Sequence, residues 1–169
     1  WLVEAGQKQS GGMVGDHNAN HIFKAVGDFD ADGDDDLLFR NDGDGQNVIW
    51  TIESGAKQSG GMVGHFDVNH SFKAVGDFDN DGDADLLFRN DSSGQNVIWA
   101  IQSGAKVSGG MVGSHNPNHG FKDVGDYDGD GDLDLFFRND TSGQNVIWLL
   151  HDGQKVSGGQ VGSFNSSAN

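Results

Sequence analysis

The sequence has no cysteine, few basic residues and no long apolar run. The absence of cysteine excludes a disulfide-stapled scaffold, but it assigns the chain to no compartment. No apolar run approaches the roughly 18 residues of a membrane-spanning helix, so we expect no membrane insertion. The 10 lysines and arginines form no cluster that could neutralise phosphates, which argues against a nucleic-acid partner. The chain also starts at Trp1, with neither an initiator methionine nor a signal peptide, which indicates a processed or excised sequence.

Acidic residues, in contrast, are abundant and concentrated. Of the 26 aspartates and glutamates, 15 are alternating aspartates in three segments, 28–36, 77–85 and 126–134, which follow one another at a spacing of 49 residues. Each of these aspartate loops places five aspartates on alternate residues around a glycine. Carboxylates this close repel one another unless a cation lies between them. Each loop therefore predicts a metal site.

The whole chain follows the same period. Tryptophan recurs at the spacing of the aspartate loops, as Trp1, Trp50, Trp99 and Trp148. Blocks 50–98 and 99–147 differ at only 14 of 49 positions, so we expect one shared fold for each block.

Within a block the pattern is that of short strands. In the second block, 72–76 precede the aspartate loop and 86–89 follow it, and further apolar segments lie at 96–101 and 106–112. Glycine-rich turns separate the segments, and no helical periodicity is present. Four short strands per repeat are typical of a β-propeller blade. The sequence therefore predicts an all-β fold, a β-propeller of four-stranded blades with a 49-residue repeat.

The blades do not add up to a whole number. Units 22–70, 71–119 and 120–169 each predict one blade with its connector or tail, whereas 1–21 predict the third and fourth strands of an incomplete blade and a connector. The chain thus predicts about three and a half blades. A propeller ring generally needs four or more blades, so we expect a homo-oligomer or a part of a longer propeller.

The aspartate loops differ from those of EF-hands. An EF-hand requires a glutamate at position twelve and helices on both sides. Position twelve is Phe39, Phe88 or Phe137 in the three copies, and the flanking segments are strand-like. An EF-hand is therefore excluded.

The remaining pattern, Asp-x-Asp-x-Asp-Gly-x-x-Asp between two strands, resembles the FG-GAP/VCBS repeats of integrin α-like propellers. The resemblance covers essentially the whole chain. It implies three Ca²⁺ per chain, usually structural, and a backbone carbonyl ligand from the seventh residue of each loop, Asp34, Asp83 or Asp132. The side-chain ligands that it implies stand at positions one, three, five and nine, namely Asp28, Asp30, Asp32, Asp36, Asp77, Asp79, Asp81, Asp85, Asp126, Asp128, Asp130 and Asp134. The alternative is a solvated acidic loop without metal. Loops of this kind fill at extracellular calcium concentrations, which favours a secreted location.

In a propeller the loops before the first strand of each blade lie on the face opposite the aspartate loops. Those connectors, 16–21, 65–70 and 114–119, are polar, and each ends in an Asn-His pair. The candidate ligand-binding residues are Asn20, His21, Asn69, His70, Asn118 and His119. Alternatively, each histidine caps the entry to a strand.

Two further residue types recur once per repeat. The tryptophans could stack on sugar rings, or they could form the core between blades. Arg40, Arg89 and Arg138 are expected to pair with nearby aspartates.

No serine or cysteine lies in a nucleophile motif and no phosphate-binding loop is present, so no enzyme is predicted. We expect a lectin-like, carbohydrate-binding module with repeated sites. The alternatives are an integrin-like module for protein interaction or adhesion, a scaffold, and a propeller fragment or engineered repeat that assembles into a closed ring.

Overall fold

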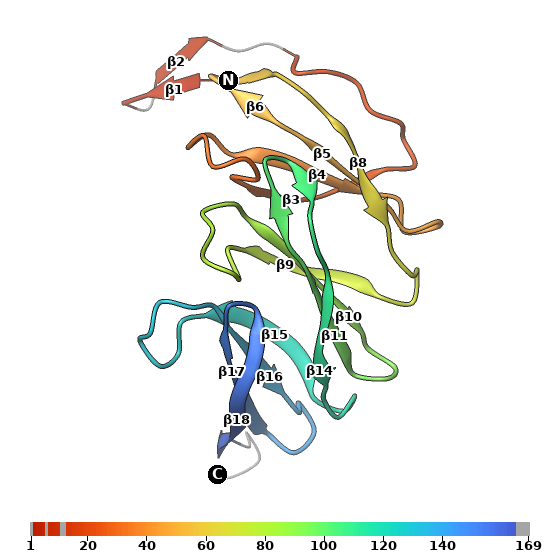
Figure 1. Ribbon diagram of the computed structural model, residues 1–169, viewed down its shortest axis with the longest axis vertical. Coiled ribbons are helices and arrows are strands. Elements are labelled where there is room, and N and C mark those ends of the chain that lie inside the picture. The colour runs from red at the N-terminus through yellow and green to blue at the C-terminus, as the bar shows by residue number, and fades with distance from the viewer. Residues whose placement is uncertain (1, 6, 11–12, 165–169) are drawn as a thin grey trace.

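The computed structural model describes residues 2–5, 7–10 and 13–164, and these residues form an all-β structure. Most of the strands lie in three antiparallel sheets of four strands (Figure 1). Within the described residues there is no helix that could span a membrane. The interpretations of Trp1 and of the end of unit 120–169 fall outside the described residues.

Each large sheet lies within one sequence repeat. The first contains β3 (Ile22–Gly27), β4 (Asp36–Arg40), β5 (Gln46–Trp50) and β8 (Gly61–His65) in that order. The second contains β9 (Ser71–Gly76), β10 (Asp85–Asn90), β11 (Gln95–Trp99) and β14 (Gly110–Ser114). The third contains β15 (Gly120–Gly125), β16 (Asp134–Arg138), β17 (Gln144–His151) and β18 (Gln154–Ser163). The expectation of four strands per repeat is thus confirmed for these sheets.

The strand register is also the same in the three sheets. A leucine at the second position of the second strand faces the tryptophan of the third strand, in the pairs Leu37–Trp50, Leu86–Trp99 and Leu135–Trp148. The pairing of the first and second strands shifts its register at the same place in each sheet. The shift lies between Phe23 and Ala25 in the first sheet, between Phe121 and Asp123 in the third, and opposite Leu87 and Phe88 in the second. The repeats therefore share not only strand order but also local distortions.

Short hairpins extend the loops between third and fourth strands. They are β6–β7 (Ile52–Glu53 and Ala56–Lys57) and β12–β13 (Ile101–Gln102 and Ala105–Lys106), whereas β17 and β18 run on without a break. A further hairpin, β1–β2 (Leu2–Glu4 and Gln7–Ser10), has the same repeat position as β6–β7. Met13 and Val14, predicted to continue its last strand, lie in no strand, because the repeat positions that would pair with them fall before residue 1.

The core lies between sheets. Phe29, Leu38 and Ile49 of the first repeat pack against Leu86, Phe88 and Trp99 of the second. The same contact recurs one repeat later, where Phe78, Leu87 and Ile98 pack against Leu135, Phe137 and Trp148. Since neighbouring residues of a strand point to opposite faces, the second sheet buries one face against the sheet before it and the other against the sheet after it.

The sheets are arranged as an open array. Their first strands, β3, β9 and β15, lie next to one another, and β1 and β18 lie at opposite ends of the array in Figure 1. The described residues therefore do not close a propeller ring. Among these residues, the first sheet has no full sheet before it and the third has none after it.

Candidate metal centres

Each aspartate loop joins the first two strands of its sheet and gathers at least three carboxylates. The carboxylate oxygens of each group lie within 4.8 Å of one another. The groups are Asp28, Asp30 and Asp32 in the first sheet, Asp77, Asp79 and Asp85 in the second, and Asp126, Asp128 and Asp134 in the third. The structure thus brings together the alternate aspartates that the sequence singled out, and each group could hold a metal ion.

The backbone of the loop is bent so that its aspartates converge. In the first copy the sixth residue, Gly33, has a positive φ of 92°, which favours glycine. Its N–H donates a hydrogen bond of 2.9 Å to the first aspartate, Asp28, and the N–H of Asp34 donates one of 2.8 Å to Asp32. The same two bonds recur in the second and third loops. The first and fifth aspartates therefore shape the loop and still retain free oxygen lone pairs.

Some carboxylate oxygens in these loops have no partner. Asp30 Oδ1, Asp77 Oδ1 and Asp79 Oδ1 are inaccessible to solvent and accept no hydrogen bond. A buried carboxylate oxygen without a donor costs free energy unless a cation binds it. Hard cations that prefer oxygen ligands, Ca²⁺ above all, suit this donor set.

The electrostatics of the loops point the same way. Burial, and then the neighbouring Asp32 carboxylate, raise the pKa of Asp30 above its usual range. Burial and the Asp81 carboxylate have the same effect on the pKa of Asp79. Burial raises the pKa of Asp85 to about 7. A divalent ion among these groups would favour their ionised forms and offset the repulsion.

The ninth aspartate has a second task that the sequence did not reveal. Asp85 is fully buried, and its two oxygens accept hydrogen bonds of 2.9 Å each from the N–H groups of Phe78 and Ile101. Asp36 and Asp134 make the equivalent pairs of bonds in the other two repeats. This aspartate thus joins its own loop to the end of the third strand or to the residues just after it.

The side chain of the seventh aspartate also makes a contact that the sequence did not reveal. Asp34 and Asp83 accept hydrogen bonds from the N–H groups of Ser54 and Ser103 at 2.6 and 3.2 Å. In the third repeat the seventh aspartate, Asp132, contacts a side chain instead of a backbone N–H: His151 Nδ1 lies 2.6 Å from Asp132 Oδ2. That contact raises the pKa of His151. Asp130, Asp132 and His151 also form a group that could hold a metal ion.

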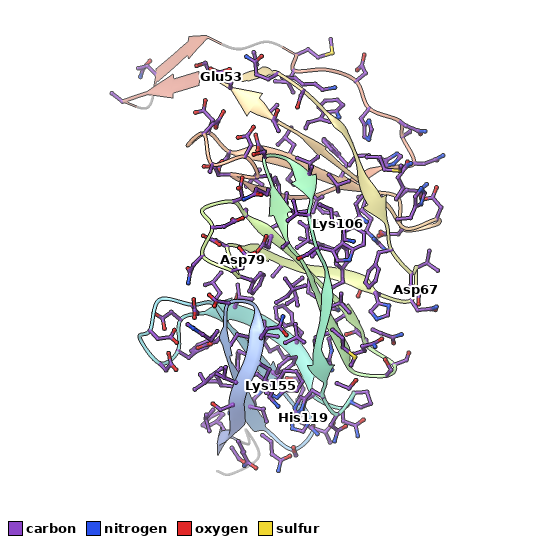
Figure 2. All side chains as sticks on the ribbon, in the orientation of Figure 1. Glu53, Asp67, Asp79, Lys106, His119 and Lys155 are labelled. Carbon is purple, nitrogen blue, oxygen red and sulfur yellow. The ribbon has the colours of Figure 1, made fainter. Side chains whose placement is uncertain are left out.

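The connectors lie at the edge of the array away from the aspartate loops. Figure 2 shows Asp79 on one edge and Asp67 and His119 on the other. In the connectors, the asparagines Asn20, Asn69 and Asn118 are exposed, whereas His70 and His119 are 5% and 7% exposed and His21 is half-buried. The His70 ring packs on Phe66, with centroids 4.7 Å apart, and its Nε2 lies 2.9 Å from Gln95 Oε1. These contacts favour the structural role of the histidine and leave the asparagine as the accessible member of each pair.

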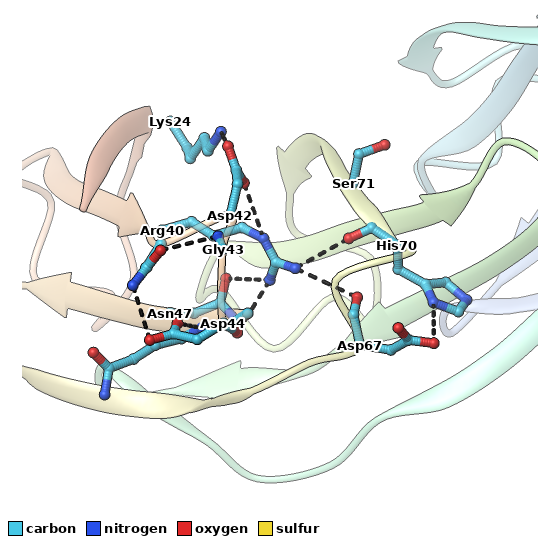
Figure 3. A network of polar contacts seen from close by, with 12 residues as sticks. Lys24, Arg40, Asp42, Gly43, Asp44, Asn47, Asp67, His70 and Ser71 are labelled. Carbon is cyan, nitrogen blue, oxygen red and sulfur yellow. Dashed lines mark hydrogen bonds and ion pairs between the residues drawn. The ribbon is translucent and has the colours of Figure 1, made fainter. Parts of the chain in front are cut away.

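Arginine side chains hold the connectors in place through hydrogen bonds to their carbonyl oxygens. The buried Arg40 guanidinium donates to the carbonyl oxygen of His70 at 3.1 Å and to Asn47 Oδ1 at 3.0 Å (Figure 3). Its Nε lies 3.3 Å from Asp42 Oδ1, which is the aspartate pairing that we expected. Arg89 makes the same set of contacts one repeat later. Arg138, after which no further sheet follows in the described residues, donates to the carbonyl oxygen of Phe164 instead.

The described tryptophans belong to the core. Trp50, Trp99 and Trp148 are each 4% exposed. Lysine ammonium groups cover their rings, with Nζ of Lys106 4.5 Å from the ring centroid of Trp99. This burial favours a packing role over a role as stacking platforms for sugars.

Comparison of the chain with protein-family models found no matching model, and comparison with curated proteins found no match.

Proposed function

We propose that the chain is a calcium-stabilised binding module whose sheets are blades of a β-propeller. The carrying observation is the recurrence, in all three sheets, of aspartates whose carboxylate oxygens lie within 4.8 Å of one another. Buried oxygens without donors in the first two groups support the presence of an ion. The role of the ion is structural, because every aspartate loop connects two strands of a sheet.

The proposed ligands follow the positions in each loop. Aspartates one, three and five supply side-chain oxygens, the ninth supplies a lone pair that its backbone donors leave free, and the seventh supplies its carbonyl oxygen. Ca²⁺ accommodates such a mixed oxygen set, whereas Mg²⁺ requires a stricter octahedron and retains water. Extracellular calcium would keep such sites filled, and we therefore place the module outside the cell.

Recognition is proposed for the edge formed by the connectors. Asn20, Asn69 and Asn118 recur there in exposed positions, one before each sheet, and each offers amide donors and an acceptor. Such groups suit the hydroxyls of carbohydrate. Three weak sites on one rigid array would bind a repeated glycan with useful avidity.

The experiment has a calcium part and a ligand part. Calorimetric titration of the chelator-treated protein should show three Ca²⁺ per chain and a rise in melting temperature, and the absence of both would overturn the calcium proposal. A glycan array, probed at millimolar Ca²⁺, should show binding that a free monosaccharide inhibits. The variant Asn69→Ala should weaken that binding. The matched control is Gln58→Ala, which removes an exposed amide outside the connectors and should leave the binding unchanged.

The alternative is a module for protein interaction, adhesion or scaffolding. The fourth strands β8 and β14 are the last strands of their sheets and carry the exposed Met62 and Met111, at 56% and 58%. Exposed edges with apolar side chains suit a protein partner. The absence of binding to the glycan array at every calcium concentration would favour this alternative.

A further inference from the structure

The two ends of the array expose surfaces that the repeats bury elsewhere. The outer face is the side of the third sheet that would meet a following sheet, formed by Tyr127, Phe136, Ile147 and Leu149. The back face is the side of the first sheet that would meet a preceding sheet, formed by Phe23, Val26, Leu37 and Phe39.

The exposure of the outer face is evident from its repeat equivalents. Tyr127 is 43% exposed, whereas Phe29 and Phe78 at the same repeat position are 0% and 1% exposed. Ile147 is half-buried, while Ile49 and Ile98 are 1% and 7% exposed. Tyr127, Ile147 and Leu149 line a groove of about 370 Å³ on this face.

The back face shows the same contrast. Phe39 and Leu37 are half-buried, whereas Phe88 and Leu86, their equivalents in the second sheet, are 0% exposed. Phe23 and Val26 are 54% and 50% exposed.

We propose that the outer face of one chain docks on the back face of a second copy of the same chain. The contact would repeat the two contacts that already join the sheets within one chain, except that the exposed Asp123 stands where Ala25 and Ala74 pack against the following sheet. It is a head-to-tail contact, since it joins different faces of the two copies. The inference is independent of calcium binding and of the ligand.

The residues that differ from the repeat at the two ends fit each other. Within the chain, Ala84 packs in one cluster with Phe29, and Leu133 packs in one cluster with Phe78. Gly27 lies close to the first pair, since a Cβ placed on it would be 3.6 Å from Phe29 Cζ and 3.1 Å from Ala84 Cβ. At the free ends the equivalent positions are both polar, with Tyr127 on the outer face and the exposed Asp35 at the edge of the back face. In the docked pair the Tyr127 hydroxyl would lie next to the Asp35 carboxylate of the second copy and donate a hydrogen bond to it.

A second end-specific contact is expected from arginine. Arg40 and Arg89 lie over Phe88 and Phe137 of the following sheet, with Cζ 5.2 and 5.1 Å from the ring centroids. Arg138 has no following sheet among the described residues of its own chain. In the docked pair it would lie over Phe39 of the second copy.

Docking has one requirement. Three periods separate 2–10 from 149–157, so the β1–β2 hairpin has the same place in the repeat as the ends of β17 and β18. The two cannot occupy one position, and the hairpin of one copy must move aside when the other copy docks. We therefore expect association that depends on protein concentration rather than a permanent dimer.

Sedimentation velocity on the full chain, at fixed millimolar Ca²⁺, tests the proposal. The expected result is a species of at least twice the mass of one chain that grows with concentration from micromolar to millimolar. Gly125→Leu should weaken association about tenfold or more. The equivalent glycines Gly27 and Gly76 lie against the next sheet, so a leucine at this position would occupy the space of the docked copy. The three atoms nearest Gly125 all belong to Tyr127, so the leucine meets no other sheet in the free chain. A chain that stays monomeric, or an association that Gly125→Leu leaves unchanged, would overturn the proposal.

A rescue experiment tests the polar pair. Tyr127→Phe leaves the Asp35 carboxylate without its donor and should weaken association about tenfold. Tyr127→Phe combined with Asp35→Ala recreates the Phe29–Ala84 pair and should restore it. Failure of the double variant to recover would contradict the proposed register.

A mixing experiment tests the head-to-tail geometry. Gly125→Leu keeps an intact back face, and Val26→Glu keeps an intact outer face. Each variant alone should therefore stay monomeric, whereas a mixture of the two should form a heterodimer. The absence of that heterodimer would exclude a head-to-tail contact. Circular dichroism checks that each variant is folded.

Discussion

The Asp85 carboxylate accepts a hydrogen bond of 2.9 Å from the N–H of Ile101, sixteen residues further along the chain. Its other oxygen accepts from the N–H of Phe78 within the aspartate loop, also at 2.9 Å. One buried side chain thus satisfies two main-chain donors from segments far apart in the sequence. Loop shape and strand position are coupled through this carboxylate, so the state of the aspartate loop should affect the stability of the whole sheet.

The pH dependence of the metal-free protein follows from the same residue. Burial raises the pKa of Asp85 to about 7 from the usual 3.8. Between these values the folded state binds a proton that the unfolded state has released, so this carboxyl removes stability as the pH rises from 4 to 7. We expect Asp85 to contribute a loss of about 2–4 kcal/mol over this range, measured by urea unfolding in chelator as the difference between the parent protein and Asp85→Asn. Asp85→Asn should flatten the slope, and an equally steep slope in this variant would contradict the assignment. Saturating Ca²⁺ should reverse the trend, because the ion binds the ionised carboxylates.

Removal of a single ligand should remove a single site. Asp79→Asn keeps the size of the side chain and deletes one charge from the second group, where Asp79 Oδ1 has no donor. Calorimetry should then show two Ca²⁺ per chain instead of three, with a smaller rise in melting temperature on calcium addition. Asp16→Asn, at an exposed position outside the loops, should leave both quantities unchanged. If Asp79→Asn still binds three ions, Asp79 is not a ligand.

The strands and the aspartate groups could be predicted from the sequence because both depend on local pattern. Alternating apolar residues and glycine-rich turns locate β9, β10 and β11, and an i, i+2, i+4 spacing brings carboxylates such as Asp28, Asp30 and Asp32 together within one tight loop. Repetition strengthened these predictions, because an error in one copy would have appeared as a mismatch with the other two.

The remaining features depend on contacts between distant segments. The donor of the Asp85 bond is the N–H of Ile101, and a main-chain donor leaves no trace in the residue type. His70 and His119 are buried beside Arg40 and Arg89, which donate to the carbonyl oxygens of these histidines from thirty residues earlier in the chain. Met13 and Val14 match Met62 and Val63 in sequence, but a strand forms only where a partner strand exists, so their similarity alone misled the prediction.

Arg89 should contribute far more to stability than its equivalent Arg138. The Arg89 side chain is fully buried and donates to the carbonyl oxygens of Gly94 and His119, each at 3.0 Å. Arg89→Met would deprive the His119 carbonyl oxygen and Asn96 Oδ1 of their arginine donor, and we expect a loss of about 3 kcal/mol in urea unfolding at fixed Ca²⁺. Arg138 is 26% exposed, and Arg138→Met should cost about 1 kcal/mol. Equal losses in the two variants would show that burial between sheets does not set the difference.

His115 should limit stability in acid. Its ring packs against Phe137 and Trp148, and the ring centroids are 5.0 and 5.3 Å apart. Phe66 occupies the equivalent position in the preceding repeat. Its ring centroid lies 5.0 and 5.2 Å from those of Phe88 and Trp99. Burial, and then the neighbouring His119, lower the pKa of His115 to about 4 from 6.5.

Between pH 6.5 and 4 the unfolded state therefore binds a proton that the folded state does not, and His115 removes stability as the pH falls. His115→Phe introduces the residue that Phe66 shows to fit this environment, so it should fold normally and lose less stability over that range than the parent protein. Urea unfolding at several pH values measures this difference. The exposed His65 provides the control, since His65→Ser copies Ser114 and should leave the acid slope unchanged. An acid slope that persists in His115→Phe would mean that other groups, and not this buried imidazole, take up the proton that unfolds the chain.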